Sequence, residues 1–204
     1  MKKTLNYITL ICLLFISAIL YYTWKNNFPL KETSKDSCIE TYKLFLRGNK
    51  TADIEGSFCT FDTLINNYGS KYNEIKYAFF DMNGDGNPEL HICSPRFYII
   101  LTLRNNDVVL WREESIYSKP LNNRAILYSR SGGAPTHIDY KYSVFNFYGE
   151  ITEEISFEKY DNNEKDLYLF SGVEVTKDIW YKLTDKYLSI KFDQIEWFDY
   201  LQTK

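Results

Sequence analysis

Apolar side chains recur at every second position from Ile75 to about residue 170, and this alternation is the feature that most constrains the fold. Apolar residues at alternate positions are typical of β-strands with one buried face. Short polar segments separate the runs, and the Asn105–Asn106 pair is typical of a tight hairpin turn. The run at 96–103 is apolar on both faces, which predicts a central strand. The pattern therefore predicts several antiparallel strands joined by hairpins.

Three helical patterns flank these strands. Two precede them, at residues 37–48 and 60–68, and a third at 175–189 follows, with Thr176 as its predicted N-cap. The predicted buried face of the third helix consists of Ile179, Trp180, Leu183 and Tyr187. This order predicts an α+β fold in which short helices pack on a mainly antiparallel sheet. The tail after residue 190 is predicted to return to the sheet as a short strand or helix.

The first 24 residues have a different character. Residues 5–24 contain no charged side chain, and a helix of that length spans about 30 Å, the thickness of the hydrocarbon core of a bilayer. Lys2 and Lys3 precede this run, which places the N-terminus in the cytoplasm by the positive-inside rule. Aromatic residues at 21–24 close the run, as is usual at a membrane interface. We therefore predict a transmembrane signal-anchor in residues 1–24.

A cleaved signal peptide is the alternative, because the apolar stretch at 8–20 is short enough for one. The best small-residue cleavage sequence, at 16–18, lies inside the apolar stretch, and the flank that follows is bulky, so an uncleaved anchor is favoured. The prediction is a single-pass protein of the cell membrane with a cytoplasmic N-terminus. Residues 25–36 are predicted as a polar linker, and residues 37–204 as an extracytoplasmic domain.

The charge of the chain excludes one class of partner. The formal net charge is −3, and without Lys2 and Lys3 the remaining chain is more acidic still. A nucleic-acid binder usually carries a basic patch or stripe. The sequence has no such feature, so nucleic acid is not an expected partner.

Three cysteines, Cys38, Cys59 and Cys93, lie in the predicted extracytoplasmic domain. An oxidising compartment permits one disulfide among them, and Cys38 with Cys59 is the predicted pair. Three small buried thiols are an equally open alternative.

Acidic residues are concentrated between two predicted strands, in the segment from Asp81 to Glu89. Asp, Asn, Asp, Asn and Glu occupy positions 1, 3, 5, 7 and 9 of this segment, and glycine occupies position 6. Calcium takes about six to eight oxygen ligands, and a loop that curls round one ion turns alternate residues inward. The predicted Ca²⁺ ligands are the side chains of Asp81, Asn83, Asp85 and Glu89 and the backbone carbonyl of Asn87.

A turn without metal is the alternative for this segment, because Asn, Asp and Gly are typical turn residues. Three carboxylates in one loop repel each other unless a cation neutralises them, and this favours the calcium interpretation. The segment resembles the D-x-[DN]-x-D-G-x-x-[DE] calcium loop of EF-hand-like proteins, dockerin-type modules and the FG-GAP and VCBS repeats of β-propellers. It departs from the EF-hand at position 12, which is Ile92, and its predicted flanks are strands.

The strand–loop–strand form of the FG-GAP type fits better, although that family usually carries Asp where this chain has Glu89. The resemblance covers nine residues, so it implies a calcium site and no particular fold. The wider order is an apolar anchor, two short helices, the acidic loop and then hairpins. This order resembles that of uncharacterised extracytoplasmic proteins of low-GC Gram-positive bacteria, for which no activity is established.

No catalytic constellation is found in the sequence, and no catalytic residue is predicted. The two histidines, His91 and His137, are not accompanied by the C-x-x-C or H-x-x-x-H spacing of a zinc site, so His91 is interpreted as a partly buried strand residue. Residues 129–137 lack the G-x-S-x-G pattern of a nucleophile elbow and are interpreted as a loop between strands.

The favoured function is therefore a membrane-anchored extracytoplasmic module without catalysis. It would hold one structural Ca²⁺ and bind an unknown protein or cell-surface polymer, with residues 5–24 in the membrane. The alternative is a surface hydrolase that is stabilised by the same calcium. The second function would require a large open cleft lined by paired acids.

Overall fold

The computed structural model describes residues 34–121, 124–132, 136–161, 166–190 and 195–200. The chain divides into two compact units, Met1–Ser34 and Lys35–Lys204, and the described helices and strands belong to the second. Within the described ranges, no helix has the length and apolar character that a membrane crossing needs. The predicted anchor at 5–24 lies outside these ranges, as does most of the predicted linker.

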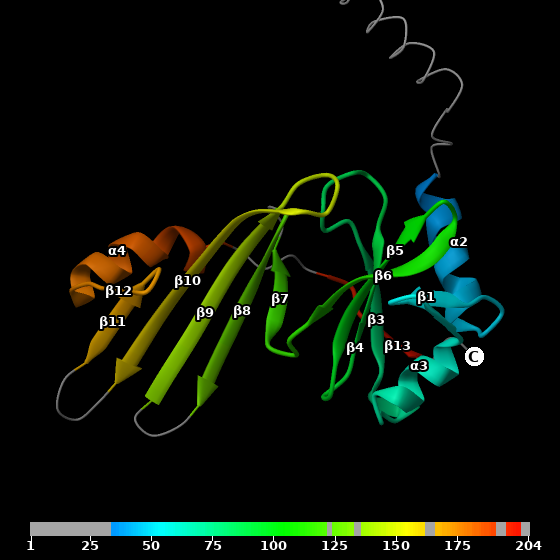
Figure 1. Cartoon of the computed structure of the whole chain (residues 1–204), viewed down its shortest axis with the longest axis horizontal. Helices are drawn as coiled ribbons and strands as arrows, with labels where there is room; N and C mark the ends of the chain where they lie inside the picture. The colour runs from blue at the N-terminus through cyan, green and yellow to red at the C-terminus, as the bar shows by residue number, and fades with distance from the viewer. Residues whose placement is uncertain (1–33, 122–123, 133–135, 162–165, 191–194, 201–204) are drawn as a thin grey trace, which may run out of the picture. The chain divides into compact units, whose positions relative to one another are not determined.

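The first sheet has seven strands in the order β13-β3-β4-β5-β6-β1-β2 (Figure 1). Its strands are β1 (Ala52–Ile54), β2 (Ser57–Cys59), β3 (Lys76–Phe80), β4 (Glu89–Cys93), β5 (Tyr98–Arg104), β6 (Asp107–Glu114) and β13 (Phe198–Asp199). Neighbouring strands are antiparallel except β1 and β6, which are parallel. The middle strand is β5, and four successive residues from Tyr98 are buried. This confirms the predicted central strand.

The β5–β6 hairpin forms as predicted. Asn105 and Asn106 have φ values of 53° and 68°, and Arg104 pairs with Asp107 across the turn. Two successive residues in the left-handed region match the twist of the flanking strands, and asparagine tolerates this conformation better than most residues. The tail also returns to this sheet, because β13 pairs with β3.

The second sheet has six antiparallel strands in the order β12-β11-β10-β9-β8-β7. They are β7 (Ser118–Leu121), β8 (Ala125–Gly132), β9 (Thr136–Phe145), β10 (Ile151–Asp161), β11 (Leu167–Phe170) and β12 (Val173–Glu174). Helix α4 (Lys177–Leu188) covers one face of this sheet, where Trp180 and Tyr187 pack with Tyr142 and Phe157. The other face carries mainly polar side chains of β9 and β10.

The predicted fold class is wrong. The described residues form thirteen strands and three short α-helices, and the strands make two sheets where the α+β prediction had one. Pairing at the edge of the first sheet explains why the strands divide into two sheets. The outer edge of β6 is paired with β1, which comes from before β3 in the chain, so the hairpins after β6 cannot extend that sheet. They pair with one another and form the second sheet.

The helices lie close to their predicted positions. Helix α3 (Phe61–Asn67) is capped by the Thr60 side chain, and α4 by that of Thr176. Helix α2 (Lys35–Leu46) begins two residues before the predicted start at residue 37. A single 3₁₀ turn, η1 (Tyr72–Glu74), leads into β3.

The buried face of α4 is only partly as predicted. Trp180 and Tyr187 are buried, whereas Ile179 is exposed and Thr184 is buried in its place. The Thr184 hydroxyl is satisfied by donating to the carbonyl of Trp180 one turn earlier, so a polar side chain can occupy a core position there.

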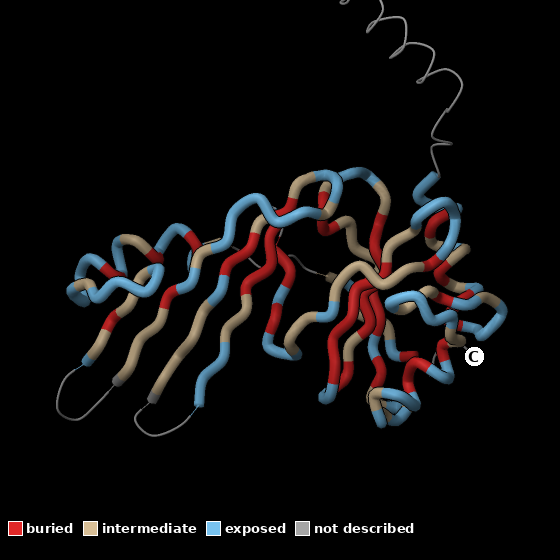
Figure 2. Tube along the Cα trace, viewed as in Figure 1, coloured by how far each residue is buried: buried red, intermediate tan, exposed pale blue. Residues whose placement is uncertain are grey.

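Three clusters of buried side chains make up the core of the second unit. The largest joins α2 and α3 to the first sheet, and another joins α4 to the second sheet. A third cluster joins the two sheets, because Ile126 and Phe145 of the second sheet pack with Met82, Tyr98 and Ile100. Figure 2 shows the buried positions concentrated in β4 and β5, whereas the described part of β9 has buried positions only toward its end and that of β10 only at Phe157.

The predicted disulfide between Cys38 and Cys59 does not form. Cys38, Cys59 and Cys93 all remain thiols in the described part of the chain. Cys38 is buried in α2 and its Sγ donates to the Asn87 side chain, 3.5 Å away, whereas Cys59 ends the edge strand β2. The alternative of separate thiols is therefore the one that the structure supports.

Candidate functional site

The acidic segment forms the connection between β3 and β4. These strands are antiparallel, and their last pair is Phe80 with Glu89, so residues 81–88 cross between the two strand ends. Both flanks are strands, as predicted. Because β4 lies beside the central strand β5, the loop is attached to the most buried part of the first sheet.

The loop is held in shape by its own polar side chains. Asp81 accepts hydrogen bonds from the backbone N–H groups of Gly84 (2.8 Å) and Gly86 (2.9 Å). Asn83 accepts from the N–H of Asp85, and Asp85 accepts from that of Asn87. Three alternate side chains therefore turn their oxygens toward the loop's own backbone. Gly86 has φ +92°, which permits the sharp turn at position 6.

Glu89 closes the loop from inside the protein. Its side chain is only 1% exposed, and Oε2 accepts a hydrogen bond of 2.8 Å from the backbone N–H of Met82. Burial raises the pKa of Glu89 to about 8, and the negative charges of Asp85 and Asp81 act in the same direction. A carboxylate that is buried beside two others is costly to ionise unless a cation compensates it.

Helix α2 packs against the far end of the loop. The Cys38 thiol donates to Asn87 Oδ1, and burial and the Asp85 charge raise the pKa of Cys38. The Asn87 side chain is thus turned toward α2.

The five predicted ligands lie in one loop, but the oxygens of its three carboxylates are not all within 4.8 Å of one another. In the described part of the chain, only one group of three His, Cys, Asp or Glu side chains has its ligand atoms within 4.8 Å of one another. That group is His137, Asp139 and Glu158, which we call the trio. It lies on the second sheet.

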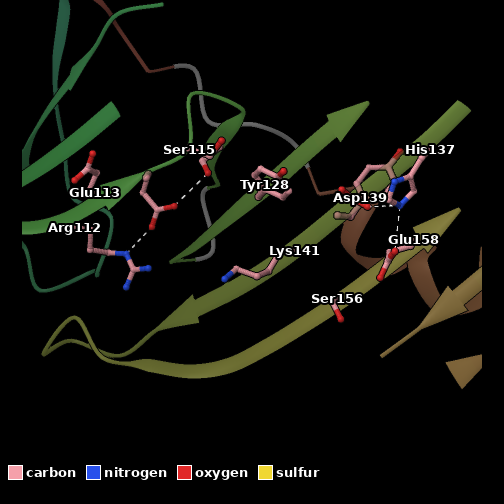
Figure 3. Close-up of a pocket in the computed structure, with 12 residues that line it drawn as sticks. Arg112, Glu113, Ser115, Tyr128, His137, Asp139, Lys141, Ser156 and Glu158 are labelled. Atoms are coloured by element: carbon pink, nitrogen blue, oxygen red, sulfur yellow. Dashed lines mark hydrogen bonds and ion pairs between the residues drawn. The ribbon is translucent and has the colours of Figure 1, made fainter. Parts of the chain in front are cut away.

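The trio lies in an open cleft of about 700 Å³ (Figure 3). The cleft lies over the polar face of β9 and β10, opposite the face that α4 covers, and the segment from Arg112 to Ser115 forms another wall. Its lining residues are Arg112, Glu113, Glu114, Ser115, Ser118, Tyr128, His137, Asp139, Tyr140, Lys141, Ser156 and Glu158. This is the cleft with neighbouring acids that a hydrolase would require.

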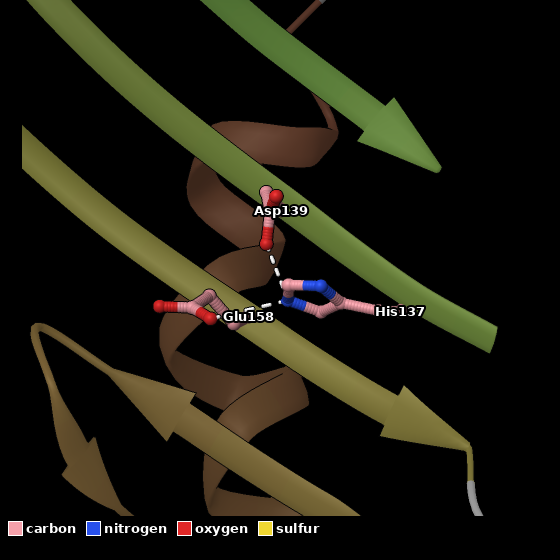
Figure 4. A group of neighbouring side chains, drawn as sticks. All are labelled: His137, Asp139 and Glu158. Carbon is pink, nitrogen blue, oxygen red and sulfur yellow. Dashed lines mark hydrogen bonds and ion pairs between the residues drawn. The ribbon is translucent and has the colours of Figure 1, made fainter. Parts of the chain in front are cut away.

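The strand register assembles the trio. Asp139 of β9 lies directly opposite Glu158 of β10, and His137 lies opposite Tyr160. Asp139 and Glu158 both contact the same ring nitrogen, Nε2 of His137, and the Glu158 oxygen is 3.1 Å from it (Figure 4). The three side chains are 29–36% exposed, so the group is open to solvent.

The cationic side chains of the cleft are already paired. Arg112 contacts Glu114 at 2.6 Å and lies over the ring of Phe145, and Lys141 contacts Glu154 at 3.2 Å. The cleft therefore offers mixed polar chemistry and no excess of positive charge. An anionic ligand would have to compete with these ion pairs.

His91 has no part in either site. It is completely buried, Nδ1 lies 2.7 Å from the Tyr98 hydroxyl, and Nε2 lies 3.3 Å from the carbonyl of Phe80. Burial lowers the pKa of His91 to about 4, so the ring is neutral near pH 7. The prediction of a structural strand histidine is confirmed, although the burial is complete where partial burial was expected.

Sequence reasoning missed the trio because its first and last members, His137 and Glu158, are 21 positions apart in the chain. The available signals were the alternation His137-x-Asp139 in one strand and Glu158-x-Tyr160 in the next. Only the β9–β10 register places these pairs together, and a shift of one residue would turn one pair to the opposite face. Comparisons with protein-family models, curated proteins and solved structures find no match to this chain.

Proposed function

We propose that this chain is a membrane-anchored extracytoplasmic module that binds one structural Ca²⁺ in the loop at 81–89. The anchor is residues 5–24, and the module binds a protein or cell-surface polymer outside the cytoplasm. The observation that carries the calcium proposal is the loop itself. Its alternate polar side chains face the loop backbone, and the buried Glu89 carboxyl closes it.

Calcium would act on the loop in two ways. It would compensate the charges of Asp81 and Asp85 and allow the Glu89 carboxyl to ionise, although burial and those two aspartates raise its pKa. It would also fix the connection between β3 and β4, which are neighbours in the core of the first sheet. Ca²⁺ suits this oxygen-only set of ligands, because it accepts flexible geometry, whereas Mg²⁺ needs a tight octahedron. The expected Kd is on the order of 10⁻⁵ to 10⁻³ M.

Thermal unfolding with calcium or with chelator tests the proposal. At a calcium concentration about one hundred times Kd, binding should add about 2.7 kcal/mol to the free energy of unfolding. For a domain of this size that corresponds to a rise of roughly 5–10 °C in Tm. Equal Tm values in calcium and chelator, with no heat of binding by calorimetry, would show that the loop is only a turn.

Matched variants separate metal binding from loop geometry. Asp85→Asn keeps an oxygen that can accept from the Asn87 N–H, but it removes a negative charge, so the calcium response should be lost while the Tm in chelator changes little. Asn87→Ala should retain the calcium response, because the predicted contact is through the backbone carbonyl. A calcium response that survives in Asp85→Asn and is lost in Asn87→Ala would contradict the ligand assignment.

A calcium-stabilised surface hydrolase is the second candidate, and the cleft is the observation that favours it. His137, Asp139, Glu158 and Ser156 all line the cleft, so acid, base and hydroxyl groups are available along one strand pair. Turnover of a p-nitrophenyl ester or phosphate, compared between the native protein and His137→Gln, tests this function. Turnover that His137→Gln abolishes would support the hydrolase, and no turnover above the buffer rate would support the binding module.

A further inference from the structure

The opposed carboxylates of Asp139 and Glu158 need an explanation. They occupy directly opposite positions of an antiparallel strand pair and point to the same face. Side chains at such positions have Cβ atoms about 4.5–5.5 Å apart, and like charges there are destabilising. The sheet therefore brings two negative groups together where a positive group is required between them.

His137 does not fully meet this requirement. Both carboxylates approach its Nε2 atom (Figure 4), yet one ring nitrogen carries at most one hydrogen. One N–H cannot make two well-aligned hydrogen bonds to two carboxylates at once. A metal ion at this point can bind the nitrogen and both carboxylates together, since all three ligand atoms already lie within 4.8 Å of one another.

We propose that the trio of His137, Asp139 and Glu158 binds a divalent transition metal, represented here by Zn²⁺. The expected contacts are Nε2 of His137 and one oxygen from each carboxylate. Ligands about 2.1 Å from a tetrahedral zinc ion are about 3.4 Å apart. Small side-chain rotations from the observed arrangement would therefore suffice. This site is independent of the calcium loop, which belongs to the first sheet.

Tyr160 positions two members of the trio. Its ring stacks on that of His137 with centroids 3.9 Å apart and an angle of 8° between the planes. Its hydroxyl donates a hydrogen bond of 2.7 Å to Glu158 Oε2. Metal sites commonly use such outer contacts to fix the orientation of the ligands. Tyr160 thus holds an imidazole ring and a carboxylate in place with one side chain.

The ligand types and the setting indicate which metal would bind. Imidazole nitrogen suits zinc and neighbouring transition metals, and nitrogen–oxygen sites bind Zn²⁺ more tightly than Mn²⁺. Three protein ligands leave a coordination position open, as in catalytic zinc sites, and the open cleft gives space for water or a small ligand there. The loop at 81–89 offers only oxygen and should prefer calcium. The two sites should therefore be selective for different ions.

Calorimetric titration of the metal-free full chain with ZnCl₂ tests the proposal. We expect one binding event, and His137→Gln, Asp139→Asn and Glu158→Gln should each lower the affinity at least tenfold. Changes to the outer contacts of metal sites already cost about 10–100-fold, so Tyr160→Phe should weaken binding within that range. Co²⁺ in place of Zn²⁺ should give the visible absorption of a four-coordinate site in the native protein and lose it in His137→Gln.

Two controls keep the result specific. Glu154→Gln changes a carboxylate on the same face of β10, beside Lys141 and outside the trio, and should leave zinc affinity unchanged. Asp85→Asn should abolish the calcium response and leave zinc binding intact, so failure of one proposal is distinguishable from failure of the other. Each variant's Tm in chelator shows whether it is folded. Zinc affinity that is equal in folded His137→Gln and native protein, or no zinc binding at all, would overturn the proposal.

Discussion

The loop at 81–89 and the trio on the second sheet both gather carboxylates, but they do so over different ranges of the chain. Among the loop's own residues, hydrogen bonds join positions two to seven apart, from Asn83 with Asp85 to Met82 with Glu89, and one from Cys38 of α2 reaches the loop from farther along the chain. In the trio, His137 meets Glu158 across 21 positions. A nine-residue segment determines the first arrangement, whereas the pairing of two long strands determines the second.

This difference predicts different sensitivities. The loop should tolerate damage on the α4 side of the second sheet, because its internal hydrogen bonds are local, its flanking strands belong to the first sheet, and its contact with the second sheet, from Met82 to Ile126 and Phe145, lies in a different cluster from α4. The trio should respond to any change that moves β9 relative to β10. Perturbations on the α4 side of the second sheet should therefore impair zinc binding and leave the calcium response in place.

The largest expected effect is that of Trp180→Ala. Trp180 is 1% exposed at the centre of the core between α4 and the second sheet, and its Nε1 donates to the carbonyl of Leu169. Its ring packs edge-on against Phe157. Removing a buried Trp side chain typically costs about 3–5 kcal/mol. Chemical denaturation should show this loss, and zinc titration should show weaker binding. Calcium should still raise the free energy of unfolding of the variant.

Tyr181→Ala is the matched control for Trp180→Ala. Tyr181 is the next residue in α4 but is 45% exposed, so its loss should cost less than about 1 kcal/mol. Similar losses in the two variants would show that helix formation, and not burial, accounts for the effect. Loss of the calcium response in Trp180→Ala would show that the loop depends on the second sheet and is not determined locally.

The next largest effect should come from the turn that connects β9 and β10. Gly149 has φ +79°, and a Cβ atom there would lie 2.7–2.9 Å from the Trp111 indole, whose Nε1 donates to the Gly149 carbonyl. Alanine would therefore bring both backbone strain and a clash with a side chain of the first sheet. Overpacking of this kind costs about 1–3 kcal/mol beyond the strain. Gly149→Ala should also weaken zinc binding, because this turn helps to set the register of the trio.

Gly172→Ala separates the cost of backbone strain from the cost of the clash. Gly172 has almost the same φ, +77°, but a Cβ atom there would meet nothing within 4 Å. It should lose about 1–2 kcal/mol for the left-handed backbone alone. The difference between the two alanine variants, measured by urea denaturation, isolates the contact with Trp111. Equal losses and equal zinc affinities would mean that the β9–β10 turn tolerates the clash.

Local signals were the part of the fold that could be predicted from sequence. Thr60 and Thr176 mark helix starts, and Asn105–Asn106 marks a hairpin. The run at 96–103, which is apolar on both faces, marks the central strand. Each depends on a few neighbouring residues. Calcium binding by the loop remains a prediction, but the polar network that would support it is encoded at the same short range.

Long-range pairing could not be predicted. The parallel pairing of Ala52 with Val108 occupies the outer edge of β6 in the first sheet. No sequence pattern near either residue predicts this pairing. That contact divides the strands between two sheets, so missing it led to the wrong fold class. The trio was missed for the same reason, because Asp139 and Glu158 become neighbours only through the register. Sequence alternation identifies the face of each strand but not its partner.

The smallest change in stability should come from Glu89→Gln, which tests whether the loop is a metal site at all. Glutamine matches glutamate in size and keeps an oxygen that can accept from the Met82 N–H. Burial already raises the pKa of Glu89 to about 8, so a neutral amide resembles the protonated carboxyl that prevails near pH 7 without metal. In chelator the free energy of unfolding should therefore change by less than about 1 kcal/mol. In calcium the native protein should gain stability and the variant should not, since the amide brings no charge. A variant that is strongly destabilised in chelator would instead assign Glu89 a purely structural role at the start of β4, and a variant that keeps the full calcium gain would remove it from the ligands.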